Sequence, residues 1–213
     1  MHTDRRIALW LAACLALGTA HAQPPVHVLE RQEVAFDLSG TRKLQLSVVQ
    51  LEGSGWTKER AIGAVREAAA ILSQCDIALT RADWLRLAVP ARYIDFFTPL
   101  SRELARLQPV DRPALYLVRE TRNHPAFEAE AIGRGNSRSR PELADTVWMI
   151  AAVRDPGIAL AHELAHVLMN SGEHSDEPGN LMREDTAPGQ TRLSAAQCSR
   201  MRQMAEGNRL FLP

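Results

Sequence analysis

The sequence predicts an α+β fold, in which a twisted mixed sheet packs against a long helix, a second helix that carries histidines, and a C-terminal helix. Three observations indicate this class. Apolar or alternating stretches of strand length recur at residues 44–51, 114–118 and 146–152. Other segments have apolar residues every three to four positions, as on one face of a helix. The 213 residues suffice for one domain with a sizeable core.

Residues 1–22 have the organisation of a secretory signal peptide, which is removed from the mature protein. Arg5 and Arg6 form the basic start, residues 7–17 are apolar, and Ala20-His21-Ala22 is a small-x-small cleavage site. The apolar run is too short for a stable membrane span. We therefore expect an exported protein, either periplasmic or secreted.

The three cysteines bear on the same question. Residues 11–14 resemble a bacterial lipobox, so an alternative is a lipoprotein anchored at Cys14. Removal of a signal peptide leaves Cys75 and Cys198, and an even pair in an oxidising compartment predicts a disulfide. This bond would join the first long helix to the last one.

The N-terminal half of the mature chain begins with residues 23–40, which are weakly patterned and predict an arm, a linker or a short pro-segment. Residues 41–213 are expected to form a single domain. Its first strand covers residues 44–51, where apolar and polar positions alternate. Thr57 then has the character of an N-cap for a helix that runs to about residue 74.

The middle of the chain is harder to interpret. Residues 76–80 predict a short strand, and residues 82–108 have helical propensity interrupted by Pro90 and Pro99, which predicts two or three short helices. The continuous apolar stretch at residues 114–118 predicts a central strand.

The second half supplies the remaining elements. Residues 127–132 predict an edge strand, residues 133–141 a surface loop, and residues 146–152 the last strand. Asp155-Pro156 is a suitable start for a helix that ends near Asn170. The final helix begins at Ser194 and runs to about residue 205, because Ser194 and Gln197 have the spacing of a capping box.

The helix that begins near residue 156 carries the sequence His162-Glu163-Leu164-Ala165-His166. Residues four apart lie on one face of a helix, so His162 and His166 can bind one metal ion. Glu163 lies beside that face, where its carboxylate can act on a water molecule held by the metal. His174 follows within reach as a third ligand.

This segment resembles the metzincin clan of zinc metalloproteases, whose signature is H-E-x-x-H-x-x-G-x-x-H followed by a turn that contains a methionine. The sequence Asn180-Leu181-Met182 resembles that Met-turn, with Met182 beneath the zinc. Met169 replaces the family glycine and Gly172 the third histidine, so His174 comes two residues late. The longer loop can still bring His174 to the metal, because loop length adds little closure entropy.

The resemblance leaves alternatives for individual roles. Glu173, Asp176 and Glu177 are rival third ligands, because zinc also accepts carboxylates. Asp176 has a second interpretation, as a residue that orients a ligand imidazole through its ring N–H. No tyrosine follows Tyr116, so the tyrosine that several metzincins place after the Met-turn has no counterpart.

The function that the resemblance implies is that of an exported metallopeptidase with one catalytic Zn²⁺ and Glu163 as general base, hydrolysing peptide bonds. Two alternatives are a non-catalytic exported zinc-containing binding module and a zinc amidase that acts on cell-wall peptides. Lys plus Arg and Asp plus Glu each number 25, so the charge does not favour a nucleic-acid partner. We expect a monomer with a peptide or protein substrate and no stable membrane span.

Overall fold

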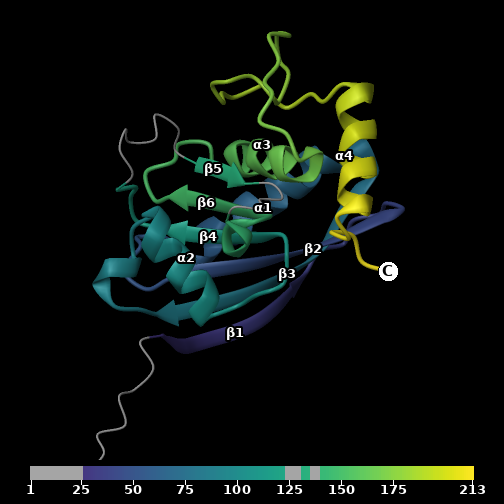
Figure 1. The fold of residues 1–213 in the computed structure, drawn as a ribbon. Coiled ribbons are helices and arrows are strands. Elements are labelled where there is room, and N and C mark those ends of the chain that lie inside the picture. The colour runs from purple at the N-terminus through teal and green to yellow at the C-terminus, as the bar shows by residue number, and fades with distance from the viewer. Residues whose placement is uncertain (1–25, 123–130, 135–139) are drawn as a thin grey trace, which may run out of the picture.

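The computed structural model describes residues 26–122, 131–134 and 140–213, and within them six strands form one sheet in the order β1-β3-β2-β4-β6-β5 (Figure 1). Strands β3, β2, β4 and β6 run parallel to one another, and β1 and β5 lie antiparallel at the two edges. The strands are β1 (His27–Ala35), β2 (Arg42–Leu51), β3 (Ile77–Ala88), β4 (Ala114–Val118), β5 (Ala131–Arg134) and β6 (Thr146–Ile150). The predicted mixed sheet is confirmed.

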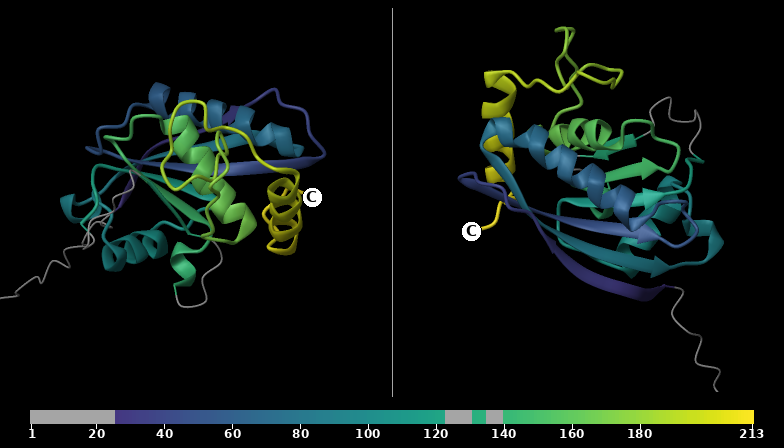
Figure 2. Two further views of the ribbon diagram at one scale, coloured as in Figure 1. Left: turned by 90° about the horizontal axis from the view of Figure 1, so that it is seen from above. Right: turned by 180° about the vertical axis from the view of Figure 1, so that it is seen from behind.

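Helices cover both faces of this sheet (Figure 2). The α-helices are α1 (Lys58–Leu72), α2 (Thr98–Leu107), α3 (Pro156–Met169) and α4 (Ala195–Gly207), and the short 3-10 helices are η1 (Ser73–Cys75), η2 (Ala91–Tyr93) and η3 (Pro141–Leu143). Successive side chains of a strand point to opposite faces. Val48 therefore belongs to the core that contains side chains of α1, α3 and α4, whereas Val49 belongs to a separate core on the other face with side chains of α2. This arrangement confirms the α+β class.

Local signals at the helix ends behave as the sequence predicts. The side chain of Thr57 accepts a hydrogen bond from the backbone N–H of Arg60 at the start of α1. Ser194 and Gln197 form a complete capping box at the start of α4. Cys75 and Cys198 form the predicted disulfide, which joins η1 to α4.

The helices predicted within residues 82–108 are partly wrong. Strand β3 continues through Ala88, far beyond the predicted end at residue 80, and pairs with β2 along its length. The segment is a strand because its backbone pairs with β1 and β2 and because Ala82, Trp84 and Leu87 are buried on the two faces of the sheet. This pairing and packing override local helix propensity. Beyond it, η2 and α2 account for the predicted short helices.

The segment predicted as an arm or linker contains β1, which pairs antiparallel with β3. Most β1 side chains are exposed on both faces, so the strand lacks the alternation that would identify it in the sequence. The predicted signal peptide and residues 127–130 of the predicted edge strand lie outside the described residues. Residues 131–134 form the edge strand β5. No helix among the described residues is long and apolar enough to cross a membrane.

Candidate metal centre

Helix α3 positions two of the three histidines in the interior. It begins at Pro156, after a five-residue connection from β6 (residues 151–155), and every residue from Gly157 to Met169 is buried. Asp155 precedes it as predicted, although its side chain makes no capping bond and its carbonyl accepts from Ala159 instead. The helix ends where Asn170 takes a left-handed conformation, with φ of 48°. Asn tolerates this region better than most residues, so the predicted stop is confirmed.

The chain beyond Asn170 turns back and brings a third imidazole to the same point. The Nε2 atoms of His162 and His166 are 2.9 Å apart, and those of His166 and His174 are 3.3 Å apart. The candidate ligand atoms of all three lie within 4.8 Å of one another. His162 and His166 are buried, and His174 is exposed. The structure thus brings together the three histidines that the sequence singled out.

Backbone carbonyl groups fix the orientation of the two buried rings. Nδ1 of His162 donates to the carbonyl of Leu181 over 2.8 Å, and Nδ1 of His166 donates to the carbonyl of Ser171 over 2.7 Å. A neutral imidazole carries one N–H, so each ring then presents a bare Nε2 lone pair. The two lone pairs face each other over 2.9 Å, an arrangement that a cation between them would stabilise.

Protonation of these rings is disfavoured. Burial, and to a smaller extent the neighbouring His162, together lower the pKa of His166 to about 4. Burial likewise lowers the pKa of His162. Ligands at about 2.0–2.1 Å from a tetrahedral zinc ion are about 3.3 Å from each other, close to the 2.9 and 3.3 Å that separate Nε2 of His166 from the other two Nε2 atoms. The donor set therefore fits a divalent metal ion that prefers nitrogen.

The predicted turn at residues 180–182 lies against α3 and is buried. Asn180, Leu181 and Met182 are each at most 3% exposed, and Met182 belongs to the same core as the α3 side chains. The backbone N–H of Ser175 donates to the carbonyl of Met182 over 2.7 Å. The turn thereby holds the loop that carries His174.

The rival carboxylates have other surroundings. Glu173 pairs with Arg200 at 2.5 Å, and this guanidinium lowers the pKa of the carboxyl. Glu177 accepts a long 3.5 Å bond from Asn180. Asp176 is exposed, and the rings of His162 and His166 donate to carbonyls instead of to its carboxylate. A role for Asp176 beside His174 stays a prediction.

Sequence reasoning missed the carbonyls of Leu181 and Ser171, because backbone acceptors leave no residue-type signal. It also missed an amide pair between Asn180 and Gln197, although the capping box had identified Gln197. Glu163, next to His162, is 8% exposed. It lies on the helix where the motif predicts.

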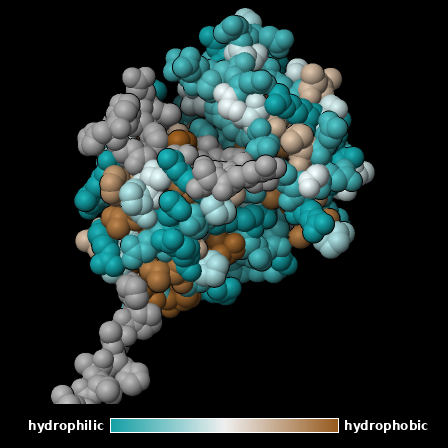
Figure 3. Space-filling view, in the orientation of Figure 1, coloured by the Kyte–Doolittle hydropathy of each residue, from teal (hydrophilic) through white to brown (hydrophobic). Residues whose placement is uncertain are grey.

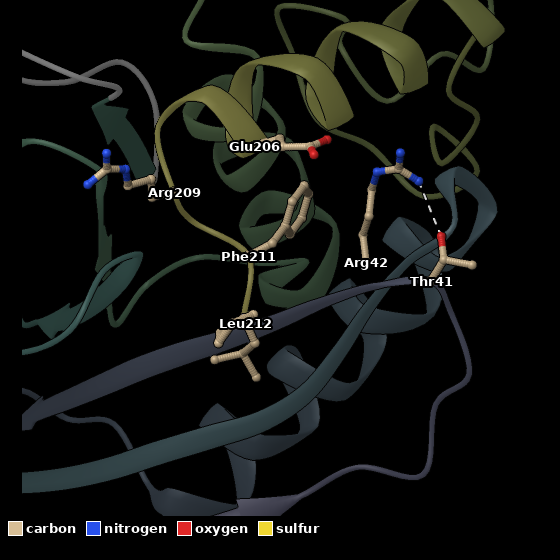
Figure 4. Close-up of a pocket in the computed structure, with 7 residues that line it drawn as sticks. Thr41, Arg42, Glu206, Arg209, Phe211 and Leu212 are labelled. Atoms are coloured by element: carbon tan, nitrogen blue, oxygen red, sulfur yellow. Dashed lines mark hydrogen bonds between the residues drawn. The ribbon is translucent and has the colours of Figure 1, made fainter.

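A pocket of about 680 Å³ lies elsewhere in the molecule, between the start of β2 and the end of α4 (Figure 4). Its lining residues are Thr41, Arg42, Glu206, Arg209, Phe211, Leu212 and Pro213. None of the three histidines lines it, so it is separate from the metal centre. The face of the molecule in Figure 3 is largely hydrophilic, with apolar residues in small groups.

The crystal structure of metalloproteinase-II from Bacteroides fragilis has a similar fold, with a TM-score of 0.51 and 17% sequence identity. The match covers 79% of this chain and 55% of that one, so this chain spans about half the length of that protein. No family model and no curated protein sequence matches the chain. The likeness supports a metalloproteinase-like fold, and the narrower resemblance to metzincins rests on residues 162–182.

Proposed function

We propose that the protein is an exported zinc metallopeptidase that hydrolyses peptide bonds. The observation that carries the proposal is the convergence of three imidazole nitrogens, two of them oriented by backbone carbonyls. An acidic residue, Glu163, follows the first of these histidines on the same buried helix. The metalloproteinase-like fold supports the same conclusion.

His162, His166 and His174 would hold the ion, which lowers the pKa of water and polarises a carbonyl group when it is bound. With these three protein ligands, a tetrahedral ion would have one further position for water or substrate. Glu163 accepts the proton of the attacking water and then transfers it to the leaving amine. Met182 is the apolar residue that we place beneath the ion.

The peptide substrate would bind as an additional strand along β5, which lies at the edge of the sheet and packs against α3. An edge strand offers unpaired backbone groups to an extended peptide. Substrate peptides that are N-methylated at one backbone amide at a time test this mode. We expect alternate amides to matter, because only every second residue of a strand faces a given neighbour. Equal cleavage of every N-methylated peptide would exclude strand addition.

Replacement of Glu163 by Gln tests the catalytic role. The variant keeps the volume of the side chain but cannot accept a proton, so we expect zinc binding to persist and cleavage to fall by about 10²–10⁴-fold. Cleavage of a peptide library is followed by mass spectrometry, and zinc content by elemental analysis. The matched control is Glu59→Gln in the first turn of α1, which should cleave at the wild-type rate. Undiminished hydrolysis by a zinc-loaded Glu163→Gln protein would refute the mechanism.

Two other functions make different forecasts. A zinc-containing binding module would hold zinc with four protein ligands and cleave nothing, whereas only three candidate ligands cluster among the described residues. A cell-wall amidase would release peptides from muropeptides and leave ordinary peptides intact. Assaying both substrate classes with one preparation separates these functions from a peptidase.

Export is the remaining part of the proposal. The mature N-terminus of the protein, recovered from cell fractions and measured by mass spectrometry, is expected at Gln23. A lipid on Cys14 would instead identify the lipoprotein. An intact N-terminus in the cytoplasmic fraction would contradict both.

A further inference from the structure

The turn that orients His162 is itself held by α4. The side-chain amides of Asn180 and Gln197 face each other and exchange two hydrogen bonds. Asn180 Nδ2 donates to Gln197 Oε1 over 3.0 Å, and Gln197 Nε2 donates to Asn180 Oδ1 over 3.1 Å. Oδ1 of Asn180 also accepts from the backbone N–H of Met182 over 2.8 Å, which fixes which way this amide points. Leu181 lies between Asn180 and Met182, and its backbone carbonyl accepts the hydrogen bond from Nδ1 of His162.

Gln197 is fixed in turn by the start of α4. Its Oε1 also accepts from the backbone N–H of Ser194 over 2.8 Å, as the second half of the capping box. The next residue, Cys198, is bonded to Cys75 at the end of η1, the short helix that follows α1. The side chain of Gln74 makes two more hydrogen bonds of 2.8 Å to the segment before α4. Its Nε2 donates to the carbonyl of Thr191, and its Oε1 accepts from the backbone N–H of Leu193. The amide pair therefore links a covalently anchored helix end to the turn.

We propose that Asn180 and Gln197 are positioning residues of the metal centre. They hold the carbonyl of Leu181 where it accepts from Nδ1 of His162, which leaves Nε2 of that ring unprotonated and directed at the ion. This inference rests on the proposed metal site, and it assigns to a C-terminal helix a role in metal affinity. Removal of a group that orients a ligand histidine typically lowers the metal affinity by about 10–100-fold.

Gln197→Glu is the sharpest perturbation. One carboxylate oxygen still accepts from Ser194 and from Asn180, so the helix cap is retained. The other oxygen replaces the Nε2 donor and faces Oδ1 of Asn180, so one bond becomes a repulsion between two acceptors. Asn180→Asp makes the corresponding change from the turn side, where it also removes the 3.5 Å bond to Glu177, and it replaces no residue of the capping box.

Ser194→Ala is the matched control, because it removes the hydroxyl that caps α4 but no contact of Asn180. It lowers the thermal midpoint of the metal-free protein through the helix alone. Zinc affinity is measured by competition with a chromophoric chelator at neutral pH. We expect zinc to bind about tenfold more weakly to Gln197→Glu and to Asn180→Asp, and with wild-type affinity to Ser194→Ala.

A second readout does not depend on affinity. The ¹⁵N chemical shifts of the His162 ring in the metal-free protein report which nitrogen carries the proton. We expect the Nδ1–H form in the wild type and a mixture of both forms in the two amide variants. If both variants bound zinc with wild-type affinity and kept the proton on Nδ1 of His162, the positioning role would be overturned, while the proposed function would stand. Failure of the wild-type protein to bind zinc would overturn the proposed function as well.

Discussion

Gly157 lies where α3 crosses α1, and the closeness of the two helices makes its replacement by Ala costly. A Cβ atom at this position would lie 2.5 Å from the Cβ of Glu67 and closer still to its carboxylate oxygen. Ordinary carbon contacts are about 3.5–4.0 Å. The carboxylate can move away, but the Glu67 Cβ is fixed to the backbone of α1. The helices must therefore separate by about 1 Å, the difference between these contact distances.

Overpacking of this kind costs about 1–3 kcal/mol. The higher helix propensity of Ala returns up to about 1 kcal/mol of this. We expect Gly157→Ala to lower the free energy of unfolding by up to about 2 kcal/mol, which is the upper overpacking cost less the gain in helix propensity. Urea denaturation followed by circular dichroism measures the change.

Gly63 provides the matched control within α1. It is exposed, and an added Cβ would meet nothing within 4 Å. Gly63→Ala should therefore raise the free energy of unfolding by about 0.5–1 kcal/mol. The double variant Gly157→Ala, Glu67→Ala should recover only part of the loss, because the contact with the Cβ of residue 67 remains. If Gly157→Ala were stabilising to the same extent as Gly63→Ala, the close approach of α1 and α3 would be refuted.

Three further predictions concern charge, the disulfide and pH. Burial alone would raise the pKa of Asp95, but bonds from Arg119 and Arg122 outweigh it and lower that pKa. Asp95→Asn should therefore lower the free energy of unfolding by about 1–3 kcal/mol at pH 7. Denaturation measured at successively lower pH should show this difference from wild type shrinking as the native carboxylate becomes protonated. The double variant Cys75→Ser, Cys198→Ser removes a disulfide between residues 123 positions apart. Chemical denaturation should show that the free energy of unfolding falls by about 4–5 kcal/mol. In the metal-free protein the pKa of His166 is lowered from 6.5 to about 4. As the pH falls, the His166 side chain becomes protonated in the unfolded chain before it does in the folded protein. The free energy of unfolding should therefore fall by roughly 3 kcal/mol between pH 7 and pH 4, and it should fall less in the His166→Gln variant.

Elements marked by local chemistry could be predicted from the sequence. The caps at Thr57 and Ser194 depend on side chains that bond to nearby backbone, so their positions follow from spacing alone. The continuous apolar stretch at 114–118 is a central strand because both of its faces are covered. These signals do not depend on the rest of the fold.

Elements defined by distant partners could not be predicted. Strand β1 exists because its backbone pairs with β3, and its exposed side chains leave no alternating pattern. The second half of β3 is a strand because β1 and β2 flank it, although its composition favours a helix. In both segments, pairing between strands far apart in sequence decides the structure.

The candidate site shows the same division. The sequence alone was enough to predict that His162 and His166 face one point, because their spacing on a helix is a local property. The third position depended on where α3 stops. The left-handed turn at Asn170 and the bond from Ser175 to Met182 bring His174 back to the other two histidines. The carbonyls that orient the rings come from the backbone and could be found only from the structure.

A crystal structure of the zinc-loaded protein, with the ion located by anomalous scattering, tests the central claim most directly. The account predicts one ion bound by Nε2 of His162, His166 and His174 at about 2.0–2.1 Å, with a non-protein oxygen in the fourth position. A carboxylate from residues 173, 176 or 177 in place of His174 would contradict the assignment of the third ligand. A fourth protein ligand on the ion would contradict the catalytic function itself.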